Sequence, residues 1–535
     1  MTAIRSILLL PLLAACATLP PAPGPSARST DTPPPVAREF RGVWVATVAN
    51  IDWPSRPGLS TWRQQVELLQ ILNRAVELHL NAVILQVRPA ADALYPSGHE
   101  PWSEYLTGQM GAAPEPAYDP LAFAVAEAHA RGLELHAWIN PFRAHHPTDT
   151  SAVSADHVSR EHPEMVRRYG DYLWLDPGDP AARRYSLGVV LDIVRRYDID
   201  GIHIDDYFYP YPEPDSLGHP MSFPDDSSWS RYVRAGGAMS RDDWRRHNID
   251  QFIESMYGEV KAAKPWVKVG ISPFGIWRPG TPPGICCFDA YARLYADSRK
   301  WLREGWLDYI TPQLYWSVGS LHQSYPALLD WWVSQNVLGR HLWPGNDINR
   351  IGTGMSGWRV DELLEQIRLT REQPGATGNV FFSMKALMSN RGGITDQLEG
   401  GPYHAPALVP ASPWLSHRVP PEPKAVARVD AATGNVVLHL APGTKHDPWL
   451  WAVQARTAGA WTTTILPGRQ RTHTIARGAG AAVPDEVVVY EVNRYGNQSA
   501  GRVVRTGCQV SGQGCQLSAV SSRPSALGSR LPAPQ

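Results

Sequence analysis

Two acidic residues stand side by side where an apolar segment ends. The segment 201–204 leads directly into Asp205 and Asp206. Burial of an unpaired carboxylate is unfavourable, since even a neutral polar group loses about 2–7 kcal/mol when it leaves water without a partner. Two carboxyls at such a position could serve a reaction that needs a proton donor and a group that meets developing positive charge, as hydrolysis of a glycosidic bond does. We therefore predict Asp205 and Asp206 as catalytic residues, and expect His203 to hydrogen-bond Asp205.

Further polar and aromatic residues fall near the ends of other apolar segments. Side chains alternate along a strand, so in a closed sheet every second residue faces the interior. Trp and Tyr combine a flat apolar face with a polar edge, which suits sugars. We expect Arg88, Asn140 and Tyr315 to bind hydroxyls or carboxylates, and Trp138 and Trp316 to stack on a ring. The predicted substrate-binding residues are Arg88, Trp138, Asn140, His203, Tyr207, Gln313, Tyr315, Trp316 and Asp347.

Eight short apolar runs, each with strand character, alternate with helical patterns. The predicted strands are 42–48, 82–88, 133–140, 201–205, 267–272, 308–315, 342–346 and 379–384. The predicted helices between them are 61–79, 120–131, 180–197, 241–264, 291–304, 325–335 and 360–371. This alternation indicates an α/β fold, and eight repeats fit a closed (β/α)8 TIM barrel better than an open sheet. Active sites of such barrels lie at the carboxyl ends of the strands, where the residues named above fall.

After residue 420 the helical patterns stop. The runs 436–440, 450–454 and 487–492 alternate as strands separated by turn residues. They predict a fibronectin-III-like β-sandwich over 420–506, behind a barrel domain over 39–415. We assign the sandwich no chemistry.

The first 16 residues resemble a bacterial lipoprotein signal peptide. Arg5 precedes the apolar run 7–13, which is too short to span a bilayer, and Ala14-Ala15-Cys16 matches a lipobox. The resemblance implies lipidation of Cys16 and attachment to the outer membrane, facing the periplasm, since no Asp follows the cysteine. The proline-rich segment 17–38 is the predicted tether.

The remaining cysteines and the end of the chain leave some questions open. Cys286 and Cys287 are adjacent, so they form either a vicinal disulfide or two free buried thiols. Cys508 and Cys515 could form a disulfide within 507–535, a Ser/Gly/Pro-rich tail for which we otherwise predict disorder. Neither pair has zinc-site spacing, and we expect no metal and no cofactor.

The composition limits the classes of partner. The chain has 535 residues, which is more than a single hydrophobic core usually supports, so we expect two domains. Its net charge of −1 lacks the excess of positive charge that is typical of nucleic-acid-binding proteins. The 21 Trp and 20 Tyr against 10 Phe favour a sugar-binding surface over a purely apolar one.

Five longer segments resemble the glycosyl-hydrolase-10-like bacterial lipoproteins. They are 39–54 (EFRGVWVATVANIDWP), 86–89 (QVRP), 136–143 (HAWINPFR), 201–210 (GIHIDDYFYP) and 309–316 (YITPQLYW). The resemblance covers about residues 38–415 and implies a glycoside hydrolase. Its best-described member type implies the substrate, namely peptidoglycan glycan strands from which amidases have removed the stem peptides. The expected partners are these strands and the membrane that holds the lipid anchor, with the protein as a monomer.

The mechanism stays open at this point. Neighbouring strand residues point to opposite faces, so Asp205 and Asp206 converge only if the strand ends there. One route uses the substrate's own N-acetyl group as nucleophile, with one Asp orienting it and the other as acid/base. A second route recruits Asp347 or another loop acid as the second carboxylate. Rival functions are a metal-dependent hydrolase using His136, His203 and Asp205, a non-catalytic glycan-binding envelope lipoprotein, and a hydrolase of another polysaccharide of the α-glucan type.

Overall fold

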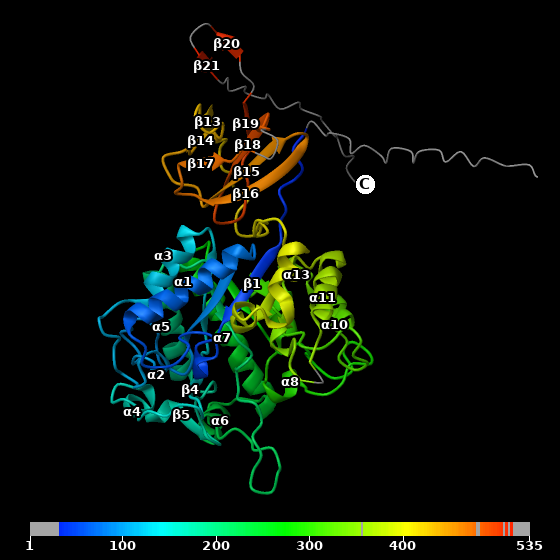
Figure 1. Ribbon diagram of the computed structural model, residues 1–535. Helices are drawn as coiled ribbons and strands as arrows, with labels where there is room; N and C mark the ends of the chain where they lie inside the picture. The colour runs from blue at the N-terminus through cyan, green and yellow to red at the C-terminus, as the bar shows by residue number, and fades with distance from the viewer. Residues whose placement is uncertain (1–31, 355–356, 478–481, 507–508, 512–513, 517–535) are drawn as a thin grey trace, which may run out of the picture.

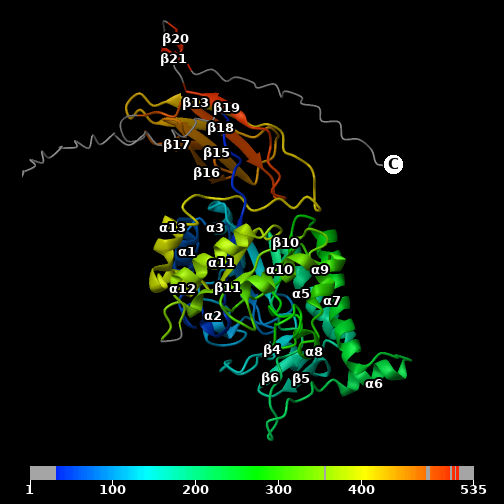
Figure 2. The same ribbon diagram turned by 90° about the vertical axis from the view of Figure 1, so that its right-hand side faces the viewer.

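The computed structural model describes residues 32–354, 357–477, 482–506, 509–511 and 514–516, the last two segments as backbone only. An α/β body forms one end of the molecule and a smaller all-β unit the other (Figure 1, Figure 2). Cys16, the predicted signal peptide and tether residues 17–31 lie outside the described residues. So do Cys508, the side chain of Cys515 and tail residues 517–535. No helix in the described ranges is long and apolar enough to cross a membrane.

The α/β body is built on a parallel sheet that closes on itself. Its strands are β1 (Phe40–Val45), β2 (Ala82–Arg88), β3 (Glu134–Ile139), β7 (Gly201–Ile204), β8 (Lys268–Ile271), β9 (Tyr309–Ile310), β10 (His341–Leu342), β11 (Gly345–Asp347) and β12 (Gly378–Phe382). The order is β10-β9-β8-β7-β3-β2-β1-β12-β11. Only Trp343 and Pro344 separate β10 from β11, so the two ends of this order belong to one strand position and the barrel is complete. The predicted (β/α)8 fold is confirmed.

Helices follow the strands and form the outer layer. The main ones are α1 (Thr61–Glu77), α3 (Pro120–Ala130), α5 (Pro180–Arg196), α7 (Arg241–Ala263), α9 (Ser298–Glu304), α10 (Tyr325–Gln335), α11 (Val360–Glu372) and α13 (Ile394–Gly400). Several begin at the residues that favour a helix start. Asp119 and Asp179 precede α3 and α5 and accept backbone N–H groups of the first turn, with Pro at the first helical position.

Shorter helices and strands lie within the loops at the carboxyl ends of the barrel strands. They are α2 (Glu104–Thr107), β4 (Arg143–His145), α4 (Val158–Glu161), β5 (Val166–Tyr169), β6 (Tyr172–Leu175), α6 (Asp226–Arg234), α8 (Ala290–Arg293) and α12 (Met384–Met388). Strands β4, β6 and β5 pair as a small antiparallel sheet after β3. This end of the barrel faces away from the all-β unit (Figure 1).

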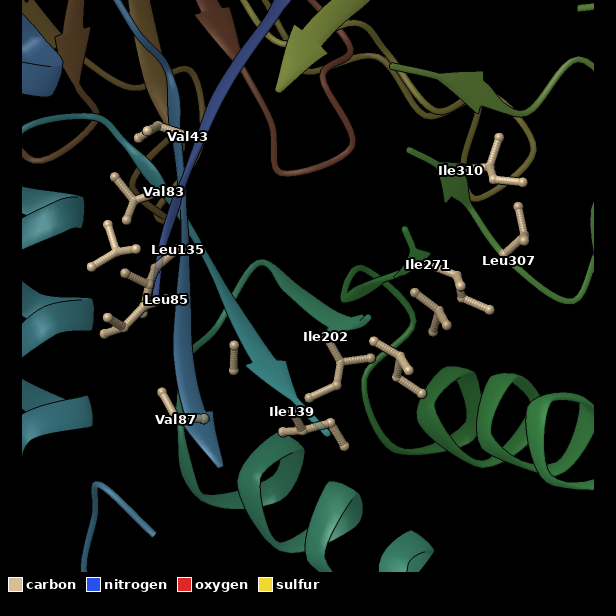
Figure 3. Close-up of a cluster of buried hydrophobic side chains, with 14 of the residues drawn as sticks. Val43, Val83, Leu85, Val87, Leu135, Ile139, Ile202, Ile271, Leu307 and Ile310 are labelled. Atoms are coloured by element: carbon tan, nitrogen blue, oxygen red, sulfur yellow. The ribbon is translucent and has the colours of Figure 1, made fainter. Parts of the chain in front are cut away.

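Two different cores lie on the two sides of the barrel sheet. On the outside, aliphatic side chains such as Val83, Leu135 and Ile202 are fully buried against the helices (Figure 3). The interior is aromatic and polar instead. The rings of Phe40 and Trp343 stack there at 3.6 Å. Alternation along each strand thus sends aliphatic residues outward and aromatic or polar residues inward.

The all-β unit consists of two antiparallel sheets around one core. Its strands are β13 (Lys424–Val429), β14 (Val436–Ala441), β15 (Leu450–Thr457), β16 (Ala460–Pro467), β17 (Thr472–Ile475), β18 (Glu486–Val492) and β19 (Arg502–Arg505). The sheet orders are β13-β14-β17 and β16-β15-β18-β19, and both contribute to an apolar cluster around Trp451. This arrangement confirms the predicted β-sandwich. Within the segment for which we predict disorder, β20 (Gln509–Ser511) pairs with β21 (Gly514–Gln516).

The sandwich lies against the amino-terminal ends of the barrel strands (Figure 1). Arg494 of the sandwich pairs with Asp200, just before β7, at 2.5 Å and also with Asp198. Arg38, just before β1, donates to the Gly496 carbonyl at 2.7 Å, and Gln454 donates to the Pro34 carbonyl at 2.9 Å. The last residues of the predicted tether therefore contact the sandwich.

Candidate active site

A cavity of about 300 Å³ opens at the carboxyl ends of the barrel strands. Seven strand positions contribute to it, through the last residues of the strand or the first residues of the loop that follows. Its lining residues are Trp44, Ala46, Val48, Ala49, Ile51, Gln86, Trp138, Arg143, His146, Asp205, Asp206, Tyr207, Tyr211, Ser272, Gln313, Tyr315 and Phe382. Aromatic rings form much of this wall, as a site for sugar rings requires.

Asp205 and Asp206 both reach this cavity because β7 ends at Ile204. The side chains no longer alternate as they would along a continuing strand. The Asp205 carboxylate accepts the Asp206 backbone N–H at 2.9 Å and the Gln313 amide at 3.0 Å. Both residues are buried, at 8% and 4% exposure.

The two carboxyls have different environments. Burial raises the pKa of Asp205, although its hydrogen-bond donors and Arg143 oppose the change. Burial and the neighbouring Asp205 charge raise the pKa of Asp206 well above its ordinary value. The Tyr211 hydroxyl donates to the Asp206 carboxyl. The pKa of Asp206 is the more strongly raised of the two, so Asp206 is the better candidate for the proton donor, and Asp205, which accepts two hydrogen bonds, is the better candidate for the anion.

Arg143 is the only lysine or arginine among the described residues that line the cavity. Its guanidinium lies 4.8 Å above the Tyr207 ring, and its Nε donates to the Pro89 carbonyl at 2.9 Å. His146 lies in the same wall. Burial, and then Arg143, lower the pKa of His146 to about 4, so this imidazole is neutral at pH 7.

Four of the predicted substrate-binding residues line the cavity, namely Trp138, Tyr207, Gln313 and Tyr315. Tyr315 stacks on Phe382 with ring centroids 6.1 Å apart, so the two form one aromatic side of the cavity. Gln313 contacts Asp205 directly, as described above. These residues occupy positions from which they can contact a bound sugar.

Arg88 and Asn140 lie outside the cavity lining, so we revise their expected role. Arg88 is fully buried and its Nε donates to both Glu100 carboxylate oxygens, at 2.8 and 2.9 Å. Its Nη1 donates to the Asn140 carbonyl. The Asn140 side-chain oxygen in turn accepts the Gln86 amide at 2.8 Å. A register shift between Gln86 and Arg88 turns Arg88 away from the interior. The structure gives both residues a structural role.

His203 lies beneath the cavity and does not hydrogen-bond Asp205 as expected. Its Nε2 lies 3.1 Å from the Trp44 indole nitrogen, which donates, and its Nδ1 lies 3.0 Å from the Tyr309 hydroxyl. Burial lowers the pKa of His203 well below its ordinary value. His203 therefore supports the cavity floor through Trp44.

Trp316 and Asp347 also lie outside the lining. Trp316 packs against Phe274 with ring centroids 5.5 Å apart. Asp347 pairs with Arg350 at 3.2 Å.

The predicted site residues do not include several lining residues, and Trp44, Tyr211 and Phe382 are the aromatic ones among them. For Trp44 and Phe382 a signal existed, because each follows the inward alternation of its strand. Tyr211 lies in a loop between two prolines, where no periodicity indicates its direction. Its contact with Asp206 became visible only in three dimensions.

Cys286 and Cys287 form a disulfide, and Cys287 is exposed. The alternative of two free buried thiols is therefore wrong. The next residue, Phe288, packs against Tyr211 with centroids 5.2 Å apart. The disulfide thus belongs to the loop that supports the tyrosine above Asp206.

His136 and His203, which we considered as metal ligands, instead make hydrogen bonds inside the barrel. His136 and His203 both contact the Tyr309 hydroxyl, at 2.8 and 3.0 Å. Gly201 and Gly270 leave room for these rings, since a Cβ at Gly270 would lie 1.8 Å from the Tyr309 ring. Across the described ranges, no group of three or more His, Cys, Asp and Glu side chains is placed to hold a metal ion.

A (β/α)8 barrel whose strand ends hold two buried carboxyls in an aromatic cavity defines a glycoside hydrolase. The comparisons with known proteins agree. The family model Glycosyl hydrolase-like 10 matches residues 39–356, and the chain belongs to this family. It is 41% identical over 453 residues to "Glycosyl hydrolase YngK" of Bacillus subtilis (strain 168), covering 82% of this chain and 86% of that one.

A second relative is "Glycosyl hydrolase DigH" of Escherichia coli (strain K12), with 34% identity over 404 residues, covering 69% of this chain and 90% of that one. Among solved structures, the glycoside hydrolase domain of PgaB (BpsB) from Bordetella bronchiseptica matches with a TM-score of 0.47 and 14% identity. That match covers 68% of this chain and 98% of that one.

Proposed function

We propose that this glycoside hydrolase cleaves peptidoglycan glycan strands that lack stem peptides, using the N-acetyl group of the substrate as nucleophile. The enzyme would act in the periplasm from a lipid anchor at Cys16. The substrate is the one that the family resemblance implies. The observation that carries the proposal is that Asp205 and Asp206 both line one aromatic-walled cavity.

The placement of the carboxyls favours substrate assistance over the route with two opposed carboxylates. Opposed carboxylates stand about 5–5.5 Å apart in retaining enzymes and about 6.5–9.5 Å apart in inverting ones. Asp205 and Asp206 instead lie close enough for their carboxyls to interact directly. They are the only acidic residues in the described lining, and Asp347 pairs with Arg350 outside it. The nucleophile is then best supplied by the sugar itself.

Each carboxyl has one task in this route. The Asp206 carboxyl gives its proton to the glycosidic oxygen as the C1–O bond breaks, and the acetamido oxygen of the same sugar bonds to C1. Asp205 accepts the acetamido N–H and stabilises the positive charge of the ring that forms. Water then attacks C1 as the bond between C1 and the acetamido oxygen breaks, which restores the N-acetyl group, and the proton of the water passes to Asp206.

The geometry also separates the rival functions. An α-glucan has no acetamido group, so its hydrolysis here would lack a nucleophile. A binding protein would have no need for a buried acid with a raised pKa, which makes the folded state less favourable. Both rivals are therefore weaker explanations of the Asp205–Asp206 pair.

The test uses amidase-treated glycan strands and mass spectrometry of the products. We expect the wild type to release fragments with new reducing ends, and Asp205→Asn and Asp206→Asn to be slower by about 10²–10⁴-fold. An aryl glycoside of N-acetylglucosamine, whose leaving group needs little protonation, should restore much of the rate of Asp206→Asn but not that of Asp205→Asn.

Asp92→Asn is the matched control. Asp92 is also buried, and burial raises its pKa to about 7, but it lies outside the cavity lining. Its variant should stay within about threefold of the wild type. Undiminished cleavage by both active-site variants would refute the proposal. Products that end in anhydro sugars would replace hydrolysis with a lytic reaction.

A further inference from the structure

Arg143 differs from the other buried arginines of the protein. Among the described residues four arginines are buried, namely Arg41, Arg88, Arg143 and Arg245. Three of them pair with a carboxylate: Arg41 with Glu39 at 2.8 Å, Arg88 with Glu100, and Arg245 with Asp225 at 2.6 Å. Arg143 is only 2% exposed, yet within the described chain it makes no such ion pair.

The guanidinium of Arg143 is held in place but not satisfied. Its Nε bond to Pro89 and its position over the Tyr207 ring fix the plane of the group. Its Nη2 is buried and has no hydrogen-bond partner among the described residues. In the same wall, the indole Nε1 of Trp138 is also buried without a partner. Among the buried side-chain donors of the described residues that lack a partner, these two belong to residues that line the cavity, where acceptors of a bound ligand can reach them.

Asp205 is not the ion-pair partner of Arg143. The charge of Arg143 lowers the Asp205 pKa from a distance, but the two side chains form no ion pair, and Asp205 takes its hydrogen bonds from Gln313 and the Asp206 backbone. An unpaired buried charge is strongly unfavourable. The missing partner is therefore an anion that enters the cavity, and a planar guanidinium suits a carboxylate.

We propose that Arg143 binds a carboxylate of the substrate beside the bond that is cleaved, and that this contact selects glycan strands without stem peptides. This inference rests on the proposed function. In peptidoglycan the carboxylate is the lactyl group of N-acetylmuramic acid, which is free only after the peptide has been removed. With the peptide attached the group is a neutral amide, and the chain behind it has to fit a cavity of about 300 Å³.

The experiment combines two enzymes with two substrates. The substrates are amidase-treated glycan strands and the same strands after conversion of their lactyl carboxylates to primary amides. The enzymes are the wild type and Arg143→Met, compared by kcat/KM. We expect the wild type to prefer the carboxylate form by about 10²-fold, and Arg143→Met to cleave both forms at the rate at which the wild type cleaves the amide.

Four outcomes decide the matter. Equal losses of Arg143→Met on both substrates would mean that Arg143 acts through Asp205, and would overturn the inference. So would a wild type without preference. A third outcome is that the enzyme cleaves a uronate-containing glycan in an Arg143-dependent manner but does not cleave peptidoglycan strands. The carboxylate that Arg143 binds would then belong to another polysaccharide, which would overturn its assignment to N-acetylmuramic acid. A wild type that cleaves no glycan strand at all would refute the proposed function itself.

Two further variants serve as controls for this experiment. Arg143→Lys keeps the charge but not the forked geometry, so it should retain part of the preference if Arg143→Met fails to fold. Arg350→Met is the matched control, because Arg350 lies near the same end of the barrel but outside the cavity lining. It should leave the preference for the carboxylate form unchanged.

Discussion

The amino-terminal end of the barrel, which the sandwich covers, and the carboxyl-terminal end, which holds the cavity, both bury acidic side chains. At the covered end each acid has a cation. Glu134 pairs with Lys268 at 2.8 Å, and Asp200 pairs with Arg494 and with His129. Burial alone would raise the pKa of Glu134 and Asp200, but these cations lower both pKa values below the ordinary range.

At the cavity end Asp205 and Asp206 are just as inaccessible, yet no Lys or Arg of the described chain forms an ion pair with them. Burial then dominates and both pKa values rise. Buried acidic side chains thus have opposite pKa shifts at the two ends of the barrel, and the presence or absence of a neighbouring cation determines the direction of the shift. Paired acids stabilise the amino-terminal end, whereas the unpaired acids can exchange protons with a substrate.

The largest expected effect comes from removing a cation at the covered end. Lys268→Met leaves Glu134 buried beside only His136. We expect a loss of about 3–5 kcal/mol in the free energy of unfolding, measured by chemical denaturation. The double variant Lys268→Met/Glu134→Gln should recover much of this loss, because no charge is then stranded. An unchanged stability of the single variant would break the comparison.

A smaller effect is expected where the sandwich supplies the cation. Arg494→Ala should lower stability at pH 7 by about 1–3 kcal/mol, since Asp200 then keeps His129 and the Leu135 backbone N–H but no arginine or lysine. The folded pKa of Asp200 is depressed, so its contribution is complete above the unfolded value of about 3.9 and is lost as the pH falls through the folded pKa. The difference between wild type and variant should therefore begin to shrink below about pH 4 and disappear only as the pH falls through the folded pKa of Asp200. A difference that grows in acid would contradict this.

The barrel itself was largely predictable. Helix α10 and strand β2 begin and end where their patterns do, because periodicity and helix-start residues act locally. Two of the errors coincide with proline, whereas the predicted helix 291–304 divides into α8 and α9 at residues 294–297, which include no proline. The predicted strand 308–315 shortens to β9 before Pro312, and the predicted strand 342–346 divides at Pro344. Proline has no N–H for the ladder, and the sequence does not say whether a sheet tolerates the gap.

The site was predictable only in part. Alternation placed Trp138, Gln313 and Tyr315 on the cavity wall, but it failed for Arg88, where the register shift changes the facing side. Alternation also says nothing about loops. Arg143 and Tyr211 depend on how the segments after β3 and β7 fold back, which long-range packing decides.

At the cavity end a substitution should stabilise the fold while it removes activity. The folded pKa of Asp206 is raised, so its ionisation opposes folding increasingly as the pH rises above the unfolded value of about 3.9. Asn carries no charge at any pH. We expect Asp206→Asn to exceed the wild type in stability by at least about 1 kcal/mol at pH 7.5, and to match it near pH 4, as measured by thermal unfolding at both pH values. A less stable variant at pH 7.5 would mean that Asp206 belongs with the paired acids.

The smallest expected effect concerns Tyr211, whose hydroxyl donates to the Asp206 carboxyl and so favours its ionised form. Loss of that donor in Tyr211→Phe should raise the Asp206 pKa further. A hydrogen bond worth about 0.5–1.5 kcal/mol corresponds to a rise of about 0.4–1 pKa unit. Because the proton donor must be protonated, the basic limb of the pH profile of kcat/KM should move upward by that amount. Tyr169→Phe is the matched control, since the Tyr169 hydroxyl donates to the Met221 carbonyl in the same loop region and does not contact Asp206. A basic limb that moves downward in Tyr211→Phe would assign the proton to a group other than Asp206.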